Sequence, residues 1–182
     1  MSYKLQYRAL DLVISLSLFP VCLILITFLS LLTILIDREN PFFTQARVGQ
    51  HKKRFTIYKM RTFKRNAPEC ASHEVDPCML LRVGKMYRAT RLDELPQLLN
   101  VILGDMSLVG PRPCLPSQLQ LIELRTKASI FDVKPGITGL SQCLGIDMRD
   151  PYILVGYDQK MLKEMSFPMY IKILHQTLRF FS

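Results

Sequence analysis

A run of about 25 uncharged, mostly apolar residues, from Leu12 to Ile36, constrains this chain more than any other feature of its sequence. As a helix it is long enough to cross a hydrocarbon core of roughly 30 Å. A cleavable signal peptide fits poorly, because the apolar region is too long and no small-residue cleavage site follows it. Two topologies remain, a helix that spans the bilayer and a re-entrant helix that enters and leaves through one face.

Two features of the run favour the re-entrant topology. Pro20 lies inside it, where proline removes a helical hydrogen bond and clashes with the preceding turn. Ser15 and Ser17 lie nearby and can satisfy backbone groups that such a break frees. Basic residues also flank both ends, at Lys4 and Arg8 before the run and at Arg38, Arg47 and residues 52–54 after it. A spanning helix usually has its basic excess on one side, but proline is common in spanning helices, so the residues alone leave both topologies open.

Composition limits the kind of partner. The 182 residues carry a formal charge of +9, and 49% of them are hydrophobic. The positive charge predicts an anionic partner, which can be a nucleic acid, a lipid surface or a phosphorylated substrate. The hydrophobic content favours the membrane, and the basic residues are not interleaved with aromatic ones as in nucleic-acid binders. The five cysteines are odd in number and form no CxxC pair, so they indicate free thiols rather than a disulfide framework or a zinc site.

After Asp37 the sequence turns polar and predicts an α+β body that is mainly helical. Alternating residues predict a strand at 55–63, preceded by residues 41–44 and a turn at 49–54. Helices are expected at 90–103, 118–131 and 167–181, the first beginning with a capping box from Thr90 to Asp93. Residues 64–80 and 104–116 are predicted as loops. The last helix has an apolar stripe that suits either the core or the bilayer surface, with Tyr170, Ile173, Leu174, Leu178 and Phe181 on it.

The adjacent acids Asp93 and Glu94 are the strongest candidates for chemistry. Neighbouring residues on a helix point roughly 100° apart, so one carboxylate can face a reacting phosphorus while the other holds a metal. A carboxylate can act as a nucleophile toward phosphorus, and Mg²⁺ commonly joins one or two carboxylates to substrate phosphates. The competing interpretation is that two acids in a first helical turn only complement the helix dipole.

Nearby arginines favour the chemical interpretation. Arg88 and Arg112 lie close to the acids along the chain, and Arg112 stands between Pro111 and Pro113, whose fixed φ angles restrain it. The planar guanidinium suits bidentate binding of phosphate. Arg91 fits better as a surface charge. No GxxxxGK[ST] or GxGxxG motif occurs in the sequence, so P-loop and dinucleotide-binding chemistry are unsupported.

Several segments resemble the bacterial sugar transferase family, the monotopic phosphoglycosyl transferases. The most specific are RLDELPQ at residues 91–97 and GDMSLVGPRP at 104–113. Further similar segments are FTQARVG at 43–49, YKMRT at 58–62 and KPGITGLSQ at 134–142. They occur in order through nearly the whole chain, which is similar to the minimal catalytic form of the family.

The resemblance implies a two-step reaction. Asp93 would attack the sugar-bearing phosphate of a UDP-sugar and expel UMP, and the phosphate of a polyprenol carrier such as undecaprenyl phosphate would then take the phospho-sugar. Glu94 would hold Mg²⁺. Phosphate would be bound by Lys59, Arg88 and Arg112, and Asp158 would be a further active-site residue. Residues 1–36 would form a re-entrant helix broken at Pro20. Residues 37–182 would form a catalytic domain with a short β-hairpin and interfacial amphipathic helices, on the cytoplasmic face of the bacterial inner membrane.

Two departures from the family pattern affect these expectations. Phe19 precedes Pro20 where the family usually has serine, which puts the geometry of the helix break in question. Leu144-Gly145-Ile146 replaces the family's NGR sequence, with Arg149 a few residues later. Two other functions share the membrane and charge features: a glycosyltransferase that releases UDP, and a non-enzymatic basic adaptor that would tolerate loss of Asp93 and Glu94.

Overall fold

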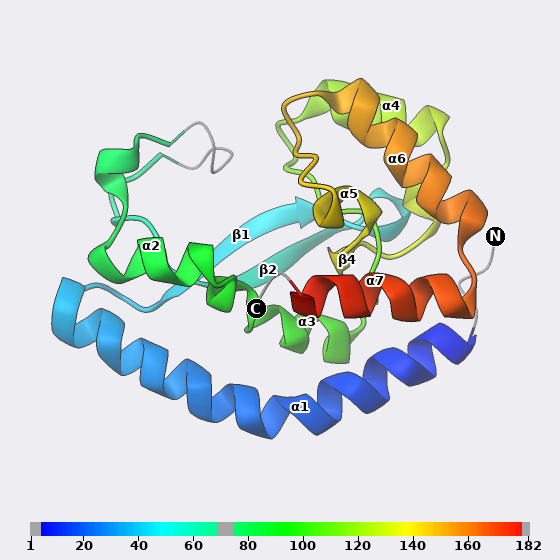
Figure 1. Ribbon diagram of the computed structural model, residues 1–182. Coiled ribbons are helices and arrows are strands. Elements are labelled where there is room, and N and C mark those ends of the chain that lie inside the picture. Colours follow the sequence, from blue (N-terminus) through cyan, green and yellow to red (C-terminus); the bar gives the residue numbers. More distant parts are fainter. Residues whose placement is uncertain (1–4, 69–74, 180–182) are drawn as a thin grey trace.

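The computed structural model describes residues 5–68 and 75–179 (Figure 1). It is a mixed α+β fold, as predicted, in which one long helix runs along the underside of a compact body. Two residues discussed above, Lys4 and Phe181, lie outside the described residues. The body contains two small sheets surrounded by short helices.

The apolar run forms helix α1, Leu5–Leu32, which continues into a π-helical turn at Thr33–Asp37. Residues 6–37 are long and apolar enough to cross a membrane. The helix is not interrupted at Pro20; it remains one helix that bows along its length, with its concave side toward the body (Figure 1). The missing proline N–H therefore costs one hydrogen bond without ending the helix. Ser15 Oγ is buried and has no hydrogen-bond partner within the described part of the chain, so it does not satisfy a helix backbone group near the proline.

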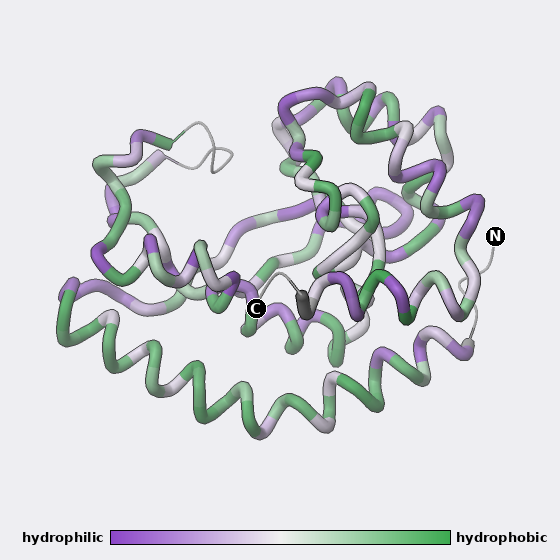
Figure 2. Tube along the Cα trace, viewed as in Figure 1, coloured by the Kyte–Doolittle hydropathy of each residue, from purple (hydrophilic) through white to green (hydrophobic). Residues whose placement is uncertain are grey.

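One stripe of α1 is buried against the body along its whole length. The stripe repeats every three, four or seven positions, as one face of a helix does, at Tyr7, Asp11, Ser15, Cys22, Ile26, Leu29 and Thr33. The opposite face is exposed and largely apolar, and Figure 2 shows hydrophobic residues along most of α1. The helix thus combines a face that packs like a core helix with a face that none of the described residues covers.

Hydrogen bonds fasten both ends of α1 to the body. Near its start, Asp11 Oδ1 accepts the Leu108 amide at 3.0 Å and also binds the Tyr170 hydroxyl, while Asp11 Oδ2 accepts from Ser107 Oγ at 2.9 Å. Beyond its other end, the two carboxylate oxygens of Asp37 accept the first amides of helix α2, Arg82–Ala89. Both ends are therefore tied to the same body.

The predicted hairpin is present. Strand β1, Phe42–Val48, pairs antiparallel with β2, Arg54–Met60, in a register that places Phe43 opposite Lys59. A second sheet pairs β3, Ser107–Val109, in parallel with β4, Gly136–Thr138, inside segments expected to be loop and turn. These two strands carry the loop at residues 110–113 toward the hairpin.

The helix expected at 90–103 is wrong in its first half. Helix α2 ends at Ala89, Arg91 adopts a left-handed φ of 53°, and a 3₁₀ turn at Leu92–Glu94 precedes α3, Gln97–Leu103. Thr90 does not begin a capping box, because its hydroxyl donates back to the Met86 carbonyl. The chain reverses between two short helices where one longer helix was predicted.

The remaining helices complete the body. The helix expected at 118–131 ends earlier, as α4, because Ser129 adopts a left-handed φ and a 3₁₀ turn follows. The last helix lies where it was predicted, and its buried Tyr170 and Ile173 belong to the core. The four helices are α4, Leu119–Lys127; α5, Leu140–Cys143; α6, Pro151–Glu164; and α7, Phe167–Arg179.

Candidate active site

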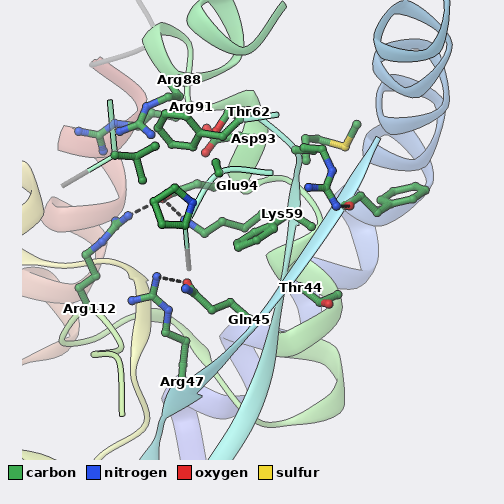
Figure 3. Close-up of a pocket in the computed structure, with 18 of the residues that line it drawn as sticks. Thr44, Gln45, Arg47, Lys59, Thr62, Arg88, Arg91, Asp93, Glu94 and Arg112 are labelled. Atoms are coloured by element: carbon green, nitrogen blue, oxygen red, sulfur yellow. Dashed lines mark hydrogen bonds and ion pairs between the residues drawn. The ribbon is translucent and has the colours of Figure 1, made fainter. Parts of the chain in front are cut away.

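A pocket of about 830 Å³ lies against the hairpin, the connection between α2 and α3, and the loops near residues 112 and 145–148 (Figure 3). Five of the residues predicted for the site line it: Lys59, Arg88, Asp93, Glu94 and Arg112. They come from segments separated by up to 53 positions in the chain, so the fold brings the predicted residues together around one hollow.

The 3₁₀ turn places Asp93 and Glu94 on the pocket wall. Arg91 reverses the chain directly before the turn, and Pro96 stands at the start of α3 directly after it. Because the turn is short and lies between two helix ends, its acidic side chains do not continue along a helix surface. Both carboxylates therefore reach the pocket from one rigid corner (Figure 3).

Two cations hold the Glu94 carboxylate. Lys59 Nζ lies 3.2 Å and Arg112 Nη2 lies 3.0 Å from the same oxygen, Oε1. Burial opposes ionisation of Glu94, but the two cations outweigh it and lower its pKa to about 2. The other oxygen, Oε2, has no hydrogen bond to any residue that the structure describes. Glu94 is thus fixed as an anion and still has a free oxygen.

The pKa of Asp93 is shifted in the opposite direction to that of Glu94. Burial raises its pKa, and the charges of Lys59, Arg88 and Arg112 only partly offset that effect. Burial also lowers the pKa of Lys59. Neighbouring carboxylates whose environments shift their pKa values in opposite directions are typical of catalytic pairs with different tasks. Asp93 makes no ion pair with a described residue and faces the pocket, where its carboxylate is available to a substrate.

The arginines surround the two carboxylates on different sides. The carboxylate of Glu94 raises the pKa of Arg112, so this guanidinium is permanently charged. Arg88 is held over the Phe63 ring, with its Cζ 5.0 Å from the ring centre. Arg91, which the sequence suggested as a surface charge, also lines the pocket beside Arg88 (Figure 3). The pocket therefore carries more positive than negative charge.

Gln45 and Arg47 are two of the β1 residues that line the pocket, and neither had a predicted role in the site. Arg47 donates through Nη1 to the Pro113 carbonyl at 3.2 Å and through Nη2 to Gln45 Oε1 at 2.8 Å. Burial and the charge of Arg112 lower the pKa of Arg47 to about 10. The strand alternation that places Gln45 and Arg47 on the same, half-buried face as Phe43 was the signal that could have identified them.

Asp158 and Arg149 do not line the pocket. Asp158, on α6, is fully buried and pairs with Arg125 of α4, a residue for which no motif or spacing predicted a role. Arg149 pairs with Asp147 at 2.6 Å and lies outside the pocket wall, although Asp147 itself is part of it. Pro20 lies in α1, away from the pocket.

The family model and the relatives that match this chain are all described as sugar or sugar-phosphate transferases. The profile described as bacterial sugar transferase matches residues 2–182. An uncharacterized sugar transferase, EpsL, of Bacillus subtilis is 41% identical over 76% of this chain and 68% of its own length.

Two further relatives have more specific names. A UDP-N-acetylgalactosamine-undecaprenyl-phosphate N-acetylgalactosaminephosphotransferase of Aeromonas hydrophila is 34% identical over 80% of this chain and 37% of its own length. A UDP-glucose:undecaprenyl-phosphate glucose-1-phosphate transferase of Caulobacter vibrioides is 37% identical over 78% of this chain and 55% of its own length. The chain therefore spans about half or less of these two relatives.

Proposed function

Because the chain belongs to the bacterial sugar transferase family, we propose that it is a phosphoglycosyl transferase that moves a phospho-sugar from a UDP-sugar to undecaprenyl phosphate and releases UMP. One observation carries the proposal: Asp93, a carboxylate with no ion pair to any residue that the structure describes, stands next to the anchored Glu94 on the wall of a cationic pocket. Phosphoryl transfer needs positioned groups and neutralisation of spread negative charge more than it needs covalent assistance.

In the first step, a carboxylate oxygen of Asp93 forms a bond to the phosphorus that carries the sugar. The bond from that phosphorus to the bridging oxygen breaks, and UMP leaves with the electron pair. In the second step, a phosphate oxygen of undecaprenyl phosphate attacks the same phosphorus and Asp93 leaves as a carboxylate. A nucleophilic carboxylate splits one displacement into two easier ones. The free oxygens of Asp93 and its exposure to the pocket support this role.

The cations around the pair serve the phosphates. Lys59 and Arg112 hold Glu94 in place and face the space next to Asp93, while Arg88 lies on the other side of the pocket. A guanidinium presents paired donors to phosphate oxygens. Arg88 and Arg112 would bind the phosphates of the donor and stabilise the charge that develops on UMP as it leaves.

A magnesium ion fits the donor set. The free Oε2 of Glu94 is a hard oxygen ligand beside the proposed nucleophile, and Mg²⁺ is usually bound by one or two carboxylates together with substrate phosphates. Mg²⁺ held by Glu94 and the donor diphosphate would neutralise phosphate charge during transfer. Lys59 and Arg112 keep Glu94 ionised across the physiological pH range, so this ligand needs no deprotonation.

The attachment of α1 supports a re-entrant rather than a spanning helix. A helix that spans a bilayer leaves its soluble domain along most of its length. Here one face of α1 is buried against the body from Tyr7 to Thr33, and both ends are fastened to it. The opposite, apolar face is free to enter lipid. Arg8 and Arg38 lie near the two ends, and under the positive-inside rule these charges support a cytoplasmic position for both ends.

Identification of the released nucleotide tests the proposal. Purified protein in nanodiscs receives undecaprenyl phosphate, Mg²⁺ and a panel of UDP-sugars, and the nucleotide product is separated by chromatography. We expect UMP with at least one donor, and its loss when EDTA removes Mg²⁺. Release of UDP would indicate a glycosyltransferase, and a membrane adaptor would release neither nucleotide.

A further inference from the structure

An ion pair behind the pocket has no task in the proposed chemistry. Asp158 Oδ2 accepts from Arg125 Nη2 at 2.6 Å and from Arg125 Nε at 3.1 Å. The two side chains are 2% and 0% exposed, so water and substrate do not reach them. Ser141 Oγ also donates to Asp158 Oδ1, at 3.4 Å. The pair joins α4 to α6 in the interior of the body.

Arg125 has a third bond that points toward the active site. Its Nη1 donates to the main-chain carbonyl of Arg112 at 2.7 Å. Arg112 in turn donates through Nη2 to Glu94 Oε1 at 3.0 Å. A continuous series of bonds therefore runs from Asp158 through Arg125 and Arg112 to the carboxylate beside the proposed nucleophile.

The loop that carries Arg112 is held at three successive carbonyls. The Pro111 carbonyl accepts the Gly136 amide at 3.0 Å, the Arg112 carbonyl accepts Arg125, and the Pro113 carbonyl accepts Arg47 at 3.2 Å. Pro111 and Pro113 have fixed φ angles. With the carbonyls held as well, little backbone freedom remains between them, and the direction in which the Arg112 side chain leaves the loop is set.

A purely stabilising role does not explain a charged pair at this place. Buried ion pairs often give no more stability than well-packed apolar residues of similar volume, because desolvation offsets their attraction. An apolar residue cannot donate to the Arg112 carbonyl, whereas a guanidinium that is charged and oriented by Asp158 can. The pair thus provides a fixed hydrogen-bond donor to the Arg112 carbonyl, which an apolar replacement lacks.

We propose that Arg125 and Asp158 are positioning residues, which hold the Arg112 loop so that the Arg112 guanidinium meets Glu94 and the donor phosphates in the reactive geometry. The kinetic part of this inference rests on the proposed transferase function. The structural part, that Arg112 loses its place when the pair is removed, does not depend on any activity.

The decisive variant replaces both members together, as Arg125→Met with Asp158→Leu. This exchange leaves no buried charge unpaired, so the protein is expected to fold with a melting temperature close to that of the original. It removes the donor to the Arg112 carbonyl. We expect kcat for UMP release to fall at least about 10-fold, because small misplacements of catalytic groups cost rate steeply.

Two comparisons separate positioning from general damage. The same double exchange in an Arg112→Ala background should lower kcat no further, because the only group that it positions is already absent. A matched control removes the exposed pair of the same helix, as Glu123→Gln with Lys127→Met, and should leave kcat unchanged. Unchanged kcat in the first variant, or an equal loss with and without Arg112, would overturn the proposal.

An NMR experiment tests the position of the Arg112 side chain without requiring turnover. In protein labelled with ¹⁵N-arginine, the side-chain resonance of Arg112 is assigned by its absence from Arg112→Ala. The bond to Glu94 should slow rotation of its guanidinium, and the double exchange should release that rotation while the surface control does not. If no donor yields UMP, the proposed function fails, but the NMR experiment still tests the positioning role. An unchanged Arg112 resonance in the double variant would overturn that role, and faster rotation of the guanidinium would support it.

Discussion

Two arginine–carboxylate pairs meet at the Arg112 loop, and their surroundings differ. The Arg112–Glu94 pair faces the pocket, with an N–O distance of 3.0 Å and an Arg112 side chain that is 39% exposed. The Arg125–Asp158 pair has a distance of 2.6 Å and is almost completely buried. The first pair shares its carboxylate oxygen with Lys59, whereas in the second pair one carboxylate serves one guanidinium.

The difference shows how the same chemical pair can serve substrate binding or architecture. Around Glu94 the cations outnumber the anions and one carboxylate oxygen remains unused, so an anionic substrate and a metal ion can still be accommodated. Around Asp158 the donors and acceptors are matched and no space faces the solvent. Chemistry should therefore depend most on the pocket acids, and stability on leaving neither member of the interior pair buried without its partner.

The largest effect is expected at Asp93. Asp93→Asn keeps the shape of the side chain but removes its nucleophilic charge, and turnover should fall by about 10⁴-fold or more, as for other nucleophiles of covalent mechanisms. The rate of UMP release measures this loss. Membrane insertion and melting temperature should not change, and Asp105→Asn, an exposed aspartate after α3, serves as the control. Substantial activity in Asp93→Asn would show that the pocket acid is not the nucleophile.

Removal of one member of the interior pair should lower stability. Arg125→Met alone leaves the buried Asp158 without its partner, and we expect the free energy of unfolding to fall by about 3–5 kcal/mol. Adding Asp158→Leu should recover most of that loss, because no uncompensated charge remains. Denaturant unfolding in detergent micelles measures both variants. Equal destabilisation by the single and the double exchange would mean that packing, and not charge balance, dominates at this site.

Acid should weaken the pocket pair in a defined range. The pKa of Glu94 is about 2 in the folded protein against an ordinary value near 4.5. A lowered carboxyl pKa contributes stability above the ordinary value, and that contribution is lost as the pH falls through the range from about 4.5 to 2. The shift corresponds to about 3 kcal/mol.

The variant Glu94→Gln isolates this contribution. Its free energy of unfolding should lack the component that the original protein loses between about pH 4.5 and 2, so the two curves converge in acid. Glu123→Gln, at an exposed glutamate, should follow the original protein instead. Parallel curves for the Glu94 variant and the original protein would show that Lys59 and Arg112 do not hold Glu94 as an anion.

The motifs predicted the pocket residues better than they predicted the backbone that presents them. The residues around Asp93 were expected on a helix that begins at Thr90, but Arg91 turns the chain at a φ of 53°. Such a conformation is uncommon outside glycine and leaves no pattern in the sequence. The predicted acids do line the pocket, but a 3₁₀ turn presents them there where a helix was expected.

Long-range contacts explain most of what the sequence did not predict. Helix α2 begins where Asp37, 45 positions earlier, accepts the Arg82 amide, so its start has no local signal. Gly84 of this helix lies against the Thr62 backbone, where a Cβ would be 2.2 Å from the carbonyl oxygen. Asp158 was expected in the active site, and only the fold reveals Arg125, 33 positions away, as its partner. The apolar run and the hairpin have strong local patterns, and both were predicted.

The smallest expected effect is the loss of a neutral hydrogen bond, against which the loss of a buried charge partner can be compared. Tyr87, buried on α2, donates its hydroxyl to the Leu29 carbonyl of α1 at 2.6 Å and lies 3.0 Å from Thr33 Oγ1. Tyr87→Phe removes these neutral bonds, but the Leu29 carbonyl still accepts from Thr33 Oγ1 at 2.9 Å. The free energy of unfolding should therefore fall by only about 1 kcal/mol.

Tyr152→Phe is the matched control for this small effect, because its hydroxyl is on the surface and 3.5 Å from Gln120. It should leave the unfolding curve unchanged under the same detergent conditions. A loss at Tyr87 as large as that of Arg125→Met would contradict the ranking, because a neutral bond with a remaining donor would then matter as much as an unpaired buried charge. The end of α1 would in that case depend on this hydroxyl, and the attachment of α1 to the body would be less secure than its buried stripe indicates.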